Sequence, residues 1–193
     1  MLTMRETLMK ICINKKKLGI ALIVLILFKI LVFKLNEKFD LYIMIFGVNQ
    51  WIINLVVDFL IIITINKLIL NHNTKKILKY IINFLTVIFI LLLLFKNLML
   101  NSSKHYFYFE SPNKSHTLVI EEDSFLLGGW SNFYERKGLI FIKSLHQEIT
   151  TDDGYKPFSR NDYELKWLDN NSVEIIYGYG SMNAYNKKII KFD

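Results

Sequence analysis

One glycine and three polar residues interrupt the apolar stretch from Tyr42 to Ile65 at a spacing that could bring them together. They are separated by three, four and four positions: Gly47, Gln50, Asn54 and Asp58. Residues three or four apart lie on the same side of an α-helix, so the sequence predicts one polar face along a helix. An ionisable group within a membrane span predicts an ion or proton site. The alternative is structural, with hydrogen bonds joining helices in a bundle and Asp58 protonated.

The partner of Asp58 can be sought from its expected depth in the membrane. At about 1.5 Å per residue, counted from the outer ends of the first two apolar runs, Lys29 lies roughly 6 Å deep and Asp58 roughly 24 Å deep. A lysine side chain cannot bridge that difference. Asn83 and Thr86, one turn apart in the third apolar run, match Asp58 in depth. We therefore predict Asn83 and Thr86 as its neighbours.

The segment TTDDGYKPF, residues 150–158, contains the clearest group of acids in the second half of the chain. Asp152 and Asp153, with the nearby Asp162 and Glu164, could supply oxygen ligands to Ca²⁺. The segment lacks the alternating acids of an EF-hand loop, and Asp-Gly is also a common turn sequence. We assign no metal here and predict Asp152 and Asp153 as surface binding residues.

The segment SFLLGGWSNFYERK combines paired glycines with aromatic residues. Gly128 and Gly129 predict a bulge or a tight loop. Exposed Trp130 and Tyr134 would form a contact surface after it. The alternative is that these aromatic side chains pack in a core.

No familiar catalytic or cofactor pattern is present in the sequence. The four histidines, His72, His105, His116 and His146, show no metal-ligand spacing, and Cys12 is the single cysteine, which excludes an intramolecular disulfide. Neither a G-x-S-x-G motif nor a phosphate-binding glycine loop occurs. The sequence therefore predicts no enzyme and no cofactor. A hydrolase site assembled from distant residues would leave no such pattern and stays open.

Three apolar runs must position the polar residues of the first half. They predict helices at about residues 18–35, 42–65 and 77–100, each long enough for a bilayer core of about 30 Å. Lys29 interrupts the first run and is expected to extend towards the headgroups. No small-x-small cleavage site follows that run, so we expect this helix to be retained and not removed as a signal peptide.

The distribution of charge predicts the orientation. The net charge of +7 comes from residues 1–100, whereas residues 101–193 are slightly acidic, which argues against nucleic-acid binding. The segment before the first run is basic, and the loop between the second and third runs carries no acid but four lysines: Lys67, Lys75, Lys76 and Lys79. By the positive-inside rule both face the cytoplasm, which places residues 101–193 outside.

The pattern after Leu100 changes to a period of two. Tyr163, Leu165 and Trp167 fall on one side of an extended chain, and a turn at residues 169–171 leads into a second strand. Further strands are predicted at 106–110, 117–122, 138–145 and 187–192. Residues 101–193 are therefore predicted to form one all-β domain, an antiparallel sheet or small sandwich, after a membrane domain at 1–100.

Three segments of this domain carry a resemblance: SPNKSHTLVIEEDSFLLGGWSNFYERKG, ITTDDGYKPFSRNDYELKW and DNNSVEIIYGYG. Over roughly residues 105–192 the chain resembles a family of uncharacterised small membrane proteins from low-GC Gram-positive bacteria, classed as a domain of unknown function. The resemblance implies a location in a bacterial cell envelope and implies no activity.

These observations favour a multi-pass membrane protein that displays an extracytoplasmic β domain for binding a protein or a cell-envelope component. The alternative is a small transport or channel-like component that uses the face formed by Gln50, Asn54 and Asp58. Three helices with one acid make a poor pathway, so transport would call for a homo-oligomer.

Overall fold

The computed structural model describes residues 2–70, 74–180 and 184–192, with side chains from residue 15 onward. The chain forms two compact units. A helical unit contains residues 1–34 and 50–98, and a β unit contains residues 35–49 and 99–193. The β unit is therefore assembled from two separate stretches of the sequence.

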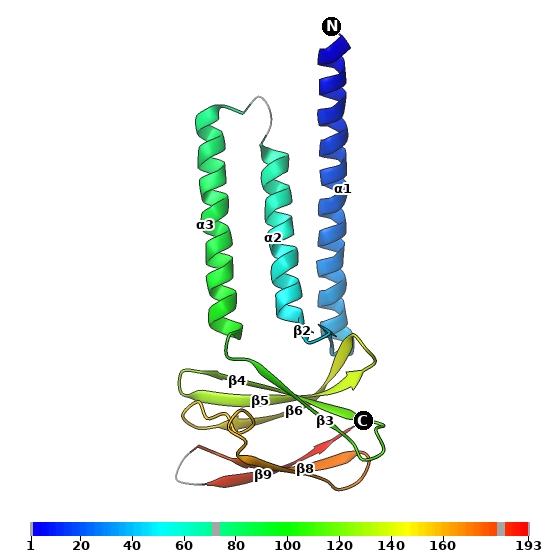
Figure 1. Ribbon diagram of the computed structural model, residues 1–193, viewed down its shortest axis with the longest axis vertical. Coiled ribbons are helices and arrows are strands. Elements are labelled where there is room, and N and C mark those ends of the chain that lie inside the picture. The colour runs from blue at the N-terminus through cyan, green and yellow to red at the C-terminus, as the bar shows by residue number, and fades with distance from the viewer. Residues whose placement is uncertain (1, 71–73, 181–183, 193) are drawn as a thin grey trace. The chain divides into compact units, whose positions relative to one another are not determined.

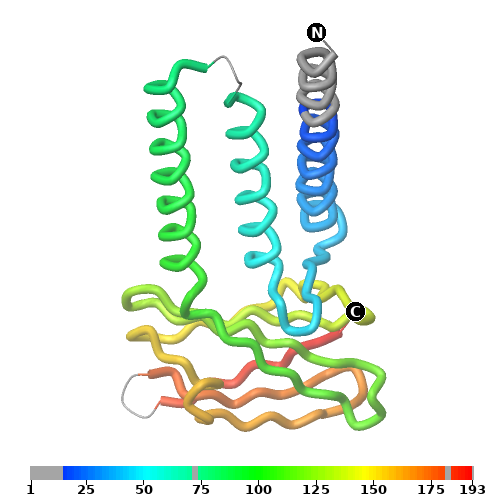
Figure 2. The backbone as a smooth tube through the Cα atoms, turned by 45° about the horizontal axis from the view of Figure 1, so that its top comes forward, coloured from blue at the N-terminus to red at the C-terminus, as the bar shows by residue number. Residues whose placement is uncertain are grey.

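The helical unit contains α1 (Leu2–Phe39), α2 (Gln50–Ile69) and α3 (Lys76–Asn101). The apolar parts Lys15–Phe39, Gln50–Ile69 and Lys76–Asn101 are each long and apolar enough to cross a membrane. Helix α2 lies between the other two (Figures 1 and 2). No side chain of α3 is buried in the protein. The prediction of three long apolar helices is confirmed.

The predicted start of the second helix at Tyr42 is wrong. Residues Leu41–Ile45 form strand β1, a turn follows at Phe46 and Gly47, and Val48–Asn49 form the short strand β2. Phe46 and Gly47 have φ angles of 48° and 82°, a backbone that cannot continue a helix. The periodicity of a short apolar run does not distinguish a helix from a buried strand. Here the segment is a strand because it pairs with a distant strand.

The β unit contains two antiparallel sheets. The six-stranded sheet has the order β2-β1-β6-β5-β4-β3, and the three-stranded sheet has the order β7-β8-β9. The strands after α3 are β3 (His105–Glu110), β4 (Thr117–Phe125), β5 (Gly128–Lys137), β6 (Phe141–Thr151), β7 (Tyr163–Trp167), β8 (Ser172–Gly178) and β9 (Tyr185–Lys191). The prediction of an all-β region with antiparallel sheets is confirmed.

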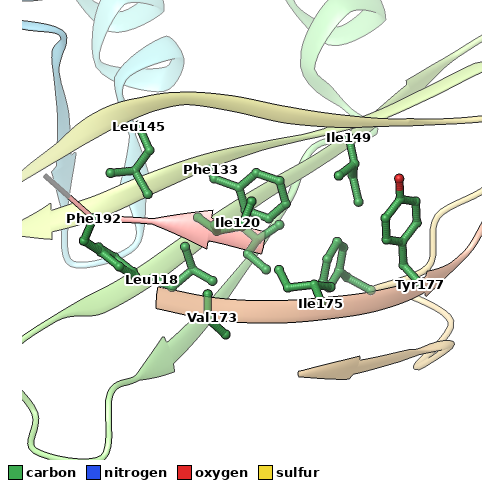
Figure 3. Packing of buried hydrophobic residues seen from close by; sticks show 11 residues of the cluster. Leu118, Ile120, Phe133, Leu145, Ile149, Val173, Ile175, Tyr177 and Phe192 are labelled. Atoms are coloured by element: carbon green, nitrogen blue, oxygen red, sulfur yellow. The ribbon is translucent and has the colours of Figure 1, made fainter. Parts of the chain in front are cut away.

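One apolar core joins the two sheets (Figure 3). Ile120 and Phe133 contribute from the six-stranded sheet and Val173 and Ile175 from the three-stranded sheet, and all four are fully buried. Phe158, from the connection between β6 and β7, is also fully buried. Each such side chain contributes about 1.5–3 kcal/mol of transfer free energy, so the core accounts for the close packing of the sheets.

The strand predictions differ in accuracy. The hairpin of β7 and β8 is confirmed, with Leu165 paired to Ile175. Strand β6 begins later than predicted and continues to Thr151. Strand β5 includes the glycine pair, for which the sequence predicts a bulge or a tight loop. Gly129 is needed there because a Cβ atom would lie 2.5 Å from the carbonyl oxygen of Tyr155.

Candidate functional site

The six-stranded sheet has a second face opposite the shared core. Side chains alternate along a strand, so Val119 and Glu121 of β4 point away from the core that Leu118 and Ile120 enter. A smaller apolar cluster of Met44, Val119, Tyr134 and Ile142 covers part of this face. A cavity of about 410 Å³ lies on it, lined by Tyr42, Asn132, Tyr134, Ser144, His146, Gln147 and Glu148. We call this the bulge cavity.

The cavity forms where β6 bulges away from β5. Asn132 pairs with Glu148 and Tyr134 with Ser144, so three residues of β6 lie opposite the single Phe133. His146, in the middle of these three, has a φ of 51°. A bulge redirects side chains that would otherwise alternate. It allows Leu145 to enter the core while His146 and Gln147 line the cavity.

Contacts on both sides fix the bulge in place. His146 Nε2 lies 3.0 Å from Asp40 Oδ2, and the backbone N–H of Ser144 donates to the Asp40 carbonyl at 2.9 Å. Gln147 Nε2 donates to the Lys191 carbonyl at 2.8 Å, and Gln147 Oε1 accepts from the Lys191 N–H at 3.2 Å. The bulge is thus joined to the start of β1 and to the end of β9. The cavity is pre-organised by these bonds.

A buried carboxylate lies beside the cavity. Glu121 is 8% exposed and accepts a hydrogen bond from the Tyr106 hydroxyl. Lys104 Nζ lies 3.4 Å from Glu121 Oε1, and Asn132 Nδ2 donates to the same oxygen at 3.4 Å. Buried charges are tolerated when paired and hydrogen-bonded, and this carboxylate has both kinds of partner.

Three tyrosines around this carboxylate have raised pKa values. Burial, followed by the charge of Glu121, raises the pKa of Tyr106 and of Tyr134. Burial, followed by the charge of Asp40, raises the pKa of Tyr42. The hydroxyls therefore stay protonated at neutral pH. They can donate and accept hydrogen bonds but do not provide a tyrosinate base.

In the helical unit, Asp58 pairs with Lys29, and the depth argument against this pair is wrong. Lys29 Nζ lies 3.0 Å from Asp58 Oδ1. Helix α1 continues to Phe39 and α2 begins at Gln50, so Lys29 is about 15 Å and Asp58 about 12 Å from the adjoining helix ends. The error came from the assumed ends of the helices.

The predicted neighbours of Asp58 bind another residue of α2. Asn66 Nδ2 donates to Asn83 Oδ1 at 3.2 Å and to Thr86 Oγ1 at 2.7 Å. Eight residues rotate a helix about 80° beyond two full turns, so Asp58 and Asn66 reach different neighbouring helices. Gln50 is the first residue of α2 and Asn54 is half-buried, whereas Gly47 lies outside the helix. Asn66 directly follows the predicted apolar run. It is not one of the residues from which the polar face was predicted, so the sequence did not identify it as a contact residue.

Of the four predicted surface residues, Tyr134 lines the bulge cavity, whereas Trp130, Asp152 and Asp153 do not. Tyr134 is 9% exposed and its ring packs edge-on against Tyr42 with centroids 5.6 Å apart, so its predicted place at the surface is wrong although it lines the cavity. Trp130 is half-buried. Asp152 and Asp153 are exposed in a turn in which Asp152 Oδ1 accepts the Asp153 N–H. Among the described residues no group of three or more His, Cys, Asp or Glu side chains could hold a metal.

The bulge cavity therefore offers hydroxyl, amide and imidazole groups and the exposed carboxylate of Glu148. Such groups bind a polar ligand through several hydrogen bonds. Comparisons with protein-family models, with curated proteins and with solved structures find no match.

Proposed function

We propose that this chain is a three-span membrane protein whose β unit lies on the extracytoplasmic side and binds a polar component of the cell envelope in the bulge cavity. The observation that carries the proposal is the cavity, which is built from three strands and held open by a bulge. Its volume of about 410 Å³ lies within the usual range for small-ligand sites.

The membrane position and orientation are supported by the helices and the charges near their ends. Each of α1, α2 and α3 contains a stretch long and apolar enough to span a bilayer. Lys67 lies in the last turn of α2, Lys75 directly precedes α3, and Lys76 and Lys79 lie in the first turn of α3. Basic residues favour the cytoplasmic side, so the opposite ends of the helices, where the β unit joins, are outside.

The groups that line the cavity favour a ligand rich in hydroxyl and amide groups, which is the chemistry of envelope glycans. The amide oxygen of Asn132 can accept a hydrogen bond, and the hydroxyls of Tyr42 and Ser144 can donate or accept one. The carboxylate oxygens of Glu148 are stronger hydrogen-bond acceptors than neutral oxygens. Tyr42 and Tyr134 add aromatic surface against which a sugar ring can pack.

The proposal can be tested with the full chain in lipid nanodiscs. We expect saccharide fragments from a cell-wall digest to bind, measured by calorimetry. Glu148→Gln should weaken binding about 10-fold or more, since a hydrogen bond to a charged group is worth about 1.5–3 kcal/mol. Glu164→Gln, at an exposed glutamate of β7, is the matched control and should bind as wild type. Equal affinity of Glu148→Gln and wild type would refute the site.

The alternative of a transport or channel-like component depends on the polar face of α2. Its acid, Asp58, is neutralised by Lys29 across the helix interface, which supports a structural role. If the binding proposal holds, Asp58→Asn leaves saccharide capture intact. Loss of a solute flux in Asp58→Asn, with the β unit dispensable, would favour transport instead.

A further inference from the structure

Large apolar side chains are exposed at three hairpin turns of the β unit. Phe46 is 93% exposed in the β1–β2 turn, Leu126 is 83% and Leu127 is 74% exposed in the β4–β5 turn, and Leu139 is 78% exposed in the β5–β6 turn. Exposed apolar groups gathered at turns are costly in water.

The three turns form two groups. In the first, the β1–β2 and β5–β6 turns lie together, because β1 pairs with β6 and the Met44 N–H donates to the Ile140 carbonyl at 2.9 Å. This first apolar group consists of Phe46, Leu139 and Ile140. The second apolar group consists of Phe125, Leu126 and Leu127.

The chain limits how far each group can lie from the end of an apolar helix. Phe46 precedes Gln50, the first residue of α2, by four residues, which span at most about 14 Å. Ser103 follows Asn101, the last residue of α3, by two residues, or about 7 Å. Ser103 Oγ donates to the carbonyl of Ser124 at 2.9 Å, directly before Phe125.

Other hairpin turns of the β unit are more polar. The β3–β4 turn has the sequence SPNKS, and the β7–β8 turn has the sequence LDNN. The whole of β3 separates the β3–β4 turn from the end of α3, and the β7–β8 turn joins strands that adjoin no helix in the chain. Exposed apolar side chains therefore occur at the turns that the chain holds near the helix ends. At the ends of a membrane-spanning helix, the hydrocarbon core is bordered by a headgroup layer about 5–8 Å thick.

Basic residues accompany the first apolar group. Arg136 and Lys137 directly precede the β5–β6 turn, and both are exposed, with Lys137 Nζ also 2.7 Å from Glu135 Oε2. Arg136 Nε donates to the Gly138 carbonyl at 3.2 Å, which holds the guanidinium at the base of the turn. Apolar tips beside exposed cations match a bilayer surface, where apolar groups enter the interface and cations meet lipid phosphates.

We propose that both apolar groups insert into the interfacial layer of the bilayer that the chain's own helices span. This inference rests on the membrane-spanning assignment made under the proposed function. Insertion of the two apolar groups adds two lipid contacts to the covalent connections between the β unit and the helices. The β unit is then held at the membrane surface and does not move freely on its linkers.

The test uses the full chain with Cys12→Ser, so that a single introduced cysteine can carry an environment-sensitive fluorophore. Phe46→Cys, Leu126→Cys and Leu139→Cys place the label in the three turns. The protein is reconstituted in vesicles of phosphatidylcholine and phosphatidylglycerol, and quenching by spin-labelled lipids is compared with quenching by aqueous iodide. We expect lipid quenching at these positions to exceed that at Leu168→Cys several-fold. Leu168 is a matched control because it is 47% exposed in the β7–β8 turn.

A label at Leu91→Cys separates the two assignments. Leu91 is 57% exposed within α3 and should be quenched by lipids labelled deep in the acyl chain. Absence of that quenching would refute the membrane-spanning assignment itself. If Leu91→Cys is quenched but the turn labels behave like Leu168→Cys, the inference is overturned. An apolar spectral shift without lipid quenching also overturns it, because a protein surface would then cover the turns.

A second measurement covers labelled variants that do not fold. Circular dichroism reports retained helix and strand content. Where it is lost, Leu139→Trp with brominated lipids replaces the label at that turn, and Leu168→Trp replaces its control. Quenching of the first tryptophan but not the second supports the inference, and equal quenching of both refutes it.

Discussion

Removing either partner of the Lys29–Asp58 pair should destabilise the helical unit. The two charged atoms are 3.0 Å apart, and the side chains are 33% and 30% exposed. At an effective dielectric constant of about 20, the direct attraction is about 5–6 kcal/mol. Desolvation and partial exposure reduce the net value, and we expect a loss of about 1–3 kcal/mol for Asp58→Asn or Lys29→Met.

The position of the pair explains why one partner alone is costly. Both residues lie about 12–15 Å from the adjoining helix ends, so a single remaining charge would be left within the apolar layer. The double variant Lys29→Met/Asp58→Asn removes both charges and should recover most of the lost stability. An exchanged pair, Lys29→Asp/Asp58→Lys, tests the same contact with its polarity reversed.

The measurement is the unfolding of the full chain in detergent micelles, followed by helical circular dichroism during titration with a denaturing detergent. The double-mutant cycle should give a coupling free energy of about 2–3 kcal/mol. Additive losses, with the double variant less stable than either single variant, would refute the pairing. Asn54→Ala, at a half-buried polar residue one turn before Asp58, is the control for general loss of polarity.

Three further predictions concern the β unit and its side of the membrane. Gly129→Ala should cost about 1–3 kcal/mol in thermal unfolding because its Cβ would lie 2.5 Å from the Tyr155 carbonyl, whereas the Cβ of Gly128→Ala meets nothing closer than 3.7 Å and should leave stability nearly unchanged. The stability of the β unit should fall as pH rises above about 10, since the unfolded state ionises Tyr106 near the ordinary pKa of 10.0 while the folded state holds its pKa higher. Tyr106→Phe should flatten that fall, measured by unfolding at successive pH values with tyrosinate absorbance as the probe, and an unchanged slope would contradict the prediction. A reporter enzyme active only outside the cytoplasm, fused after Asp193, should be active, and an inactive but intact fusion would reverse the orientation.

The candidate site could be predicted only in part from the sequence. Tyr134 was selected as an exposed aromatic residue, but it is buried and lines the cavity from within the sheet. Ser144, His146 and Glu148 had no sequence signal, because a bulge opposite Phe133 brings them to one face. Asp152 and Asp153 are exposed, as expected for surface residues, but they do not line the cavity. A site assembled from several strands depends on register, which local spacing does not contain.

The sequence by itself determined the elements that rest on local patterns. Apolar length is sufficient to define three long helices, and alternation with a central turn is sufficient to define the β7–β8 hairpin, since both depend on neighbouring residues. The tertiary structure decided that Leu41–Ile45 is a strand, because its partner β6 lies about a hundred residues later in the chain. That strand shortens α2, which brings Asp58 to the depth of Lys29. Contacts between distant segments therefore fixed both the cavity and the ion pair.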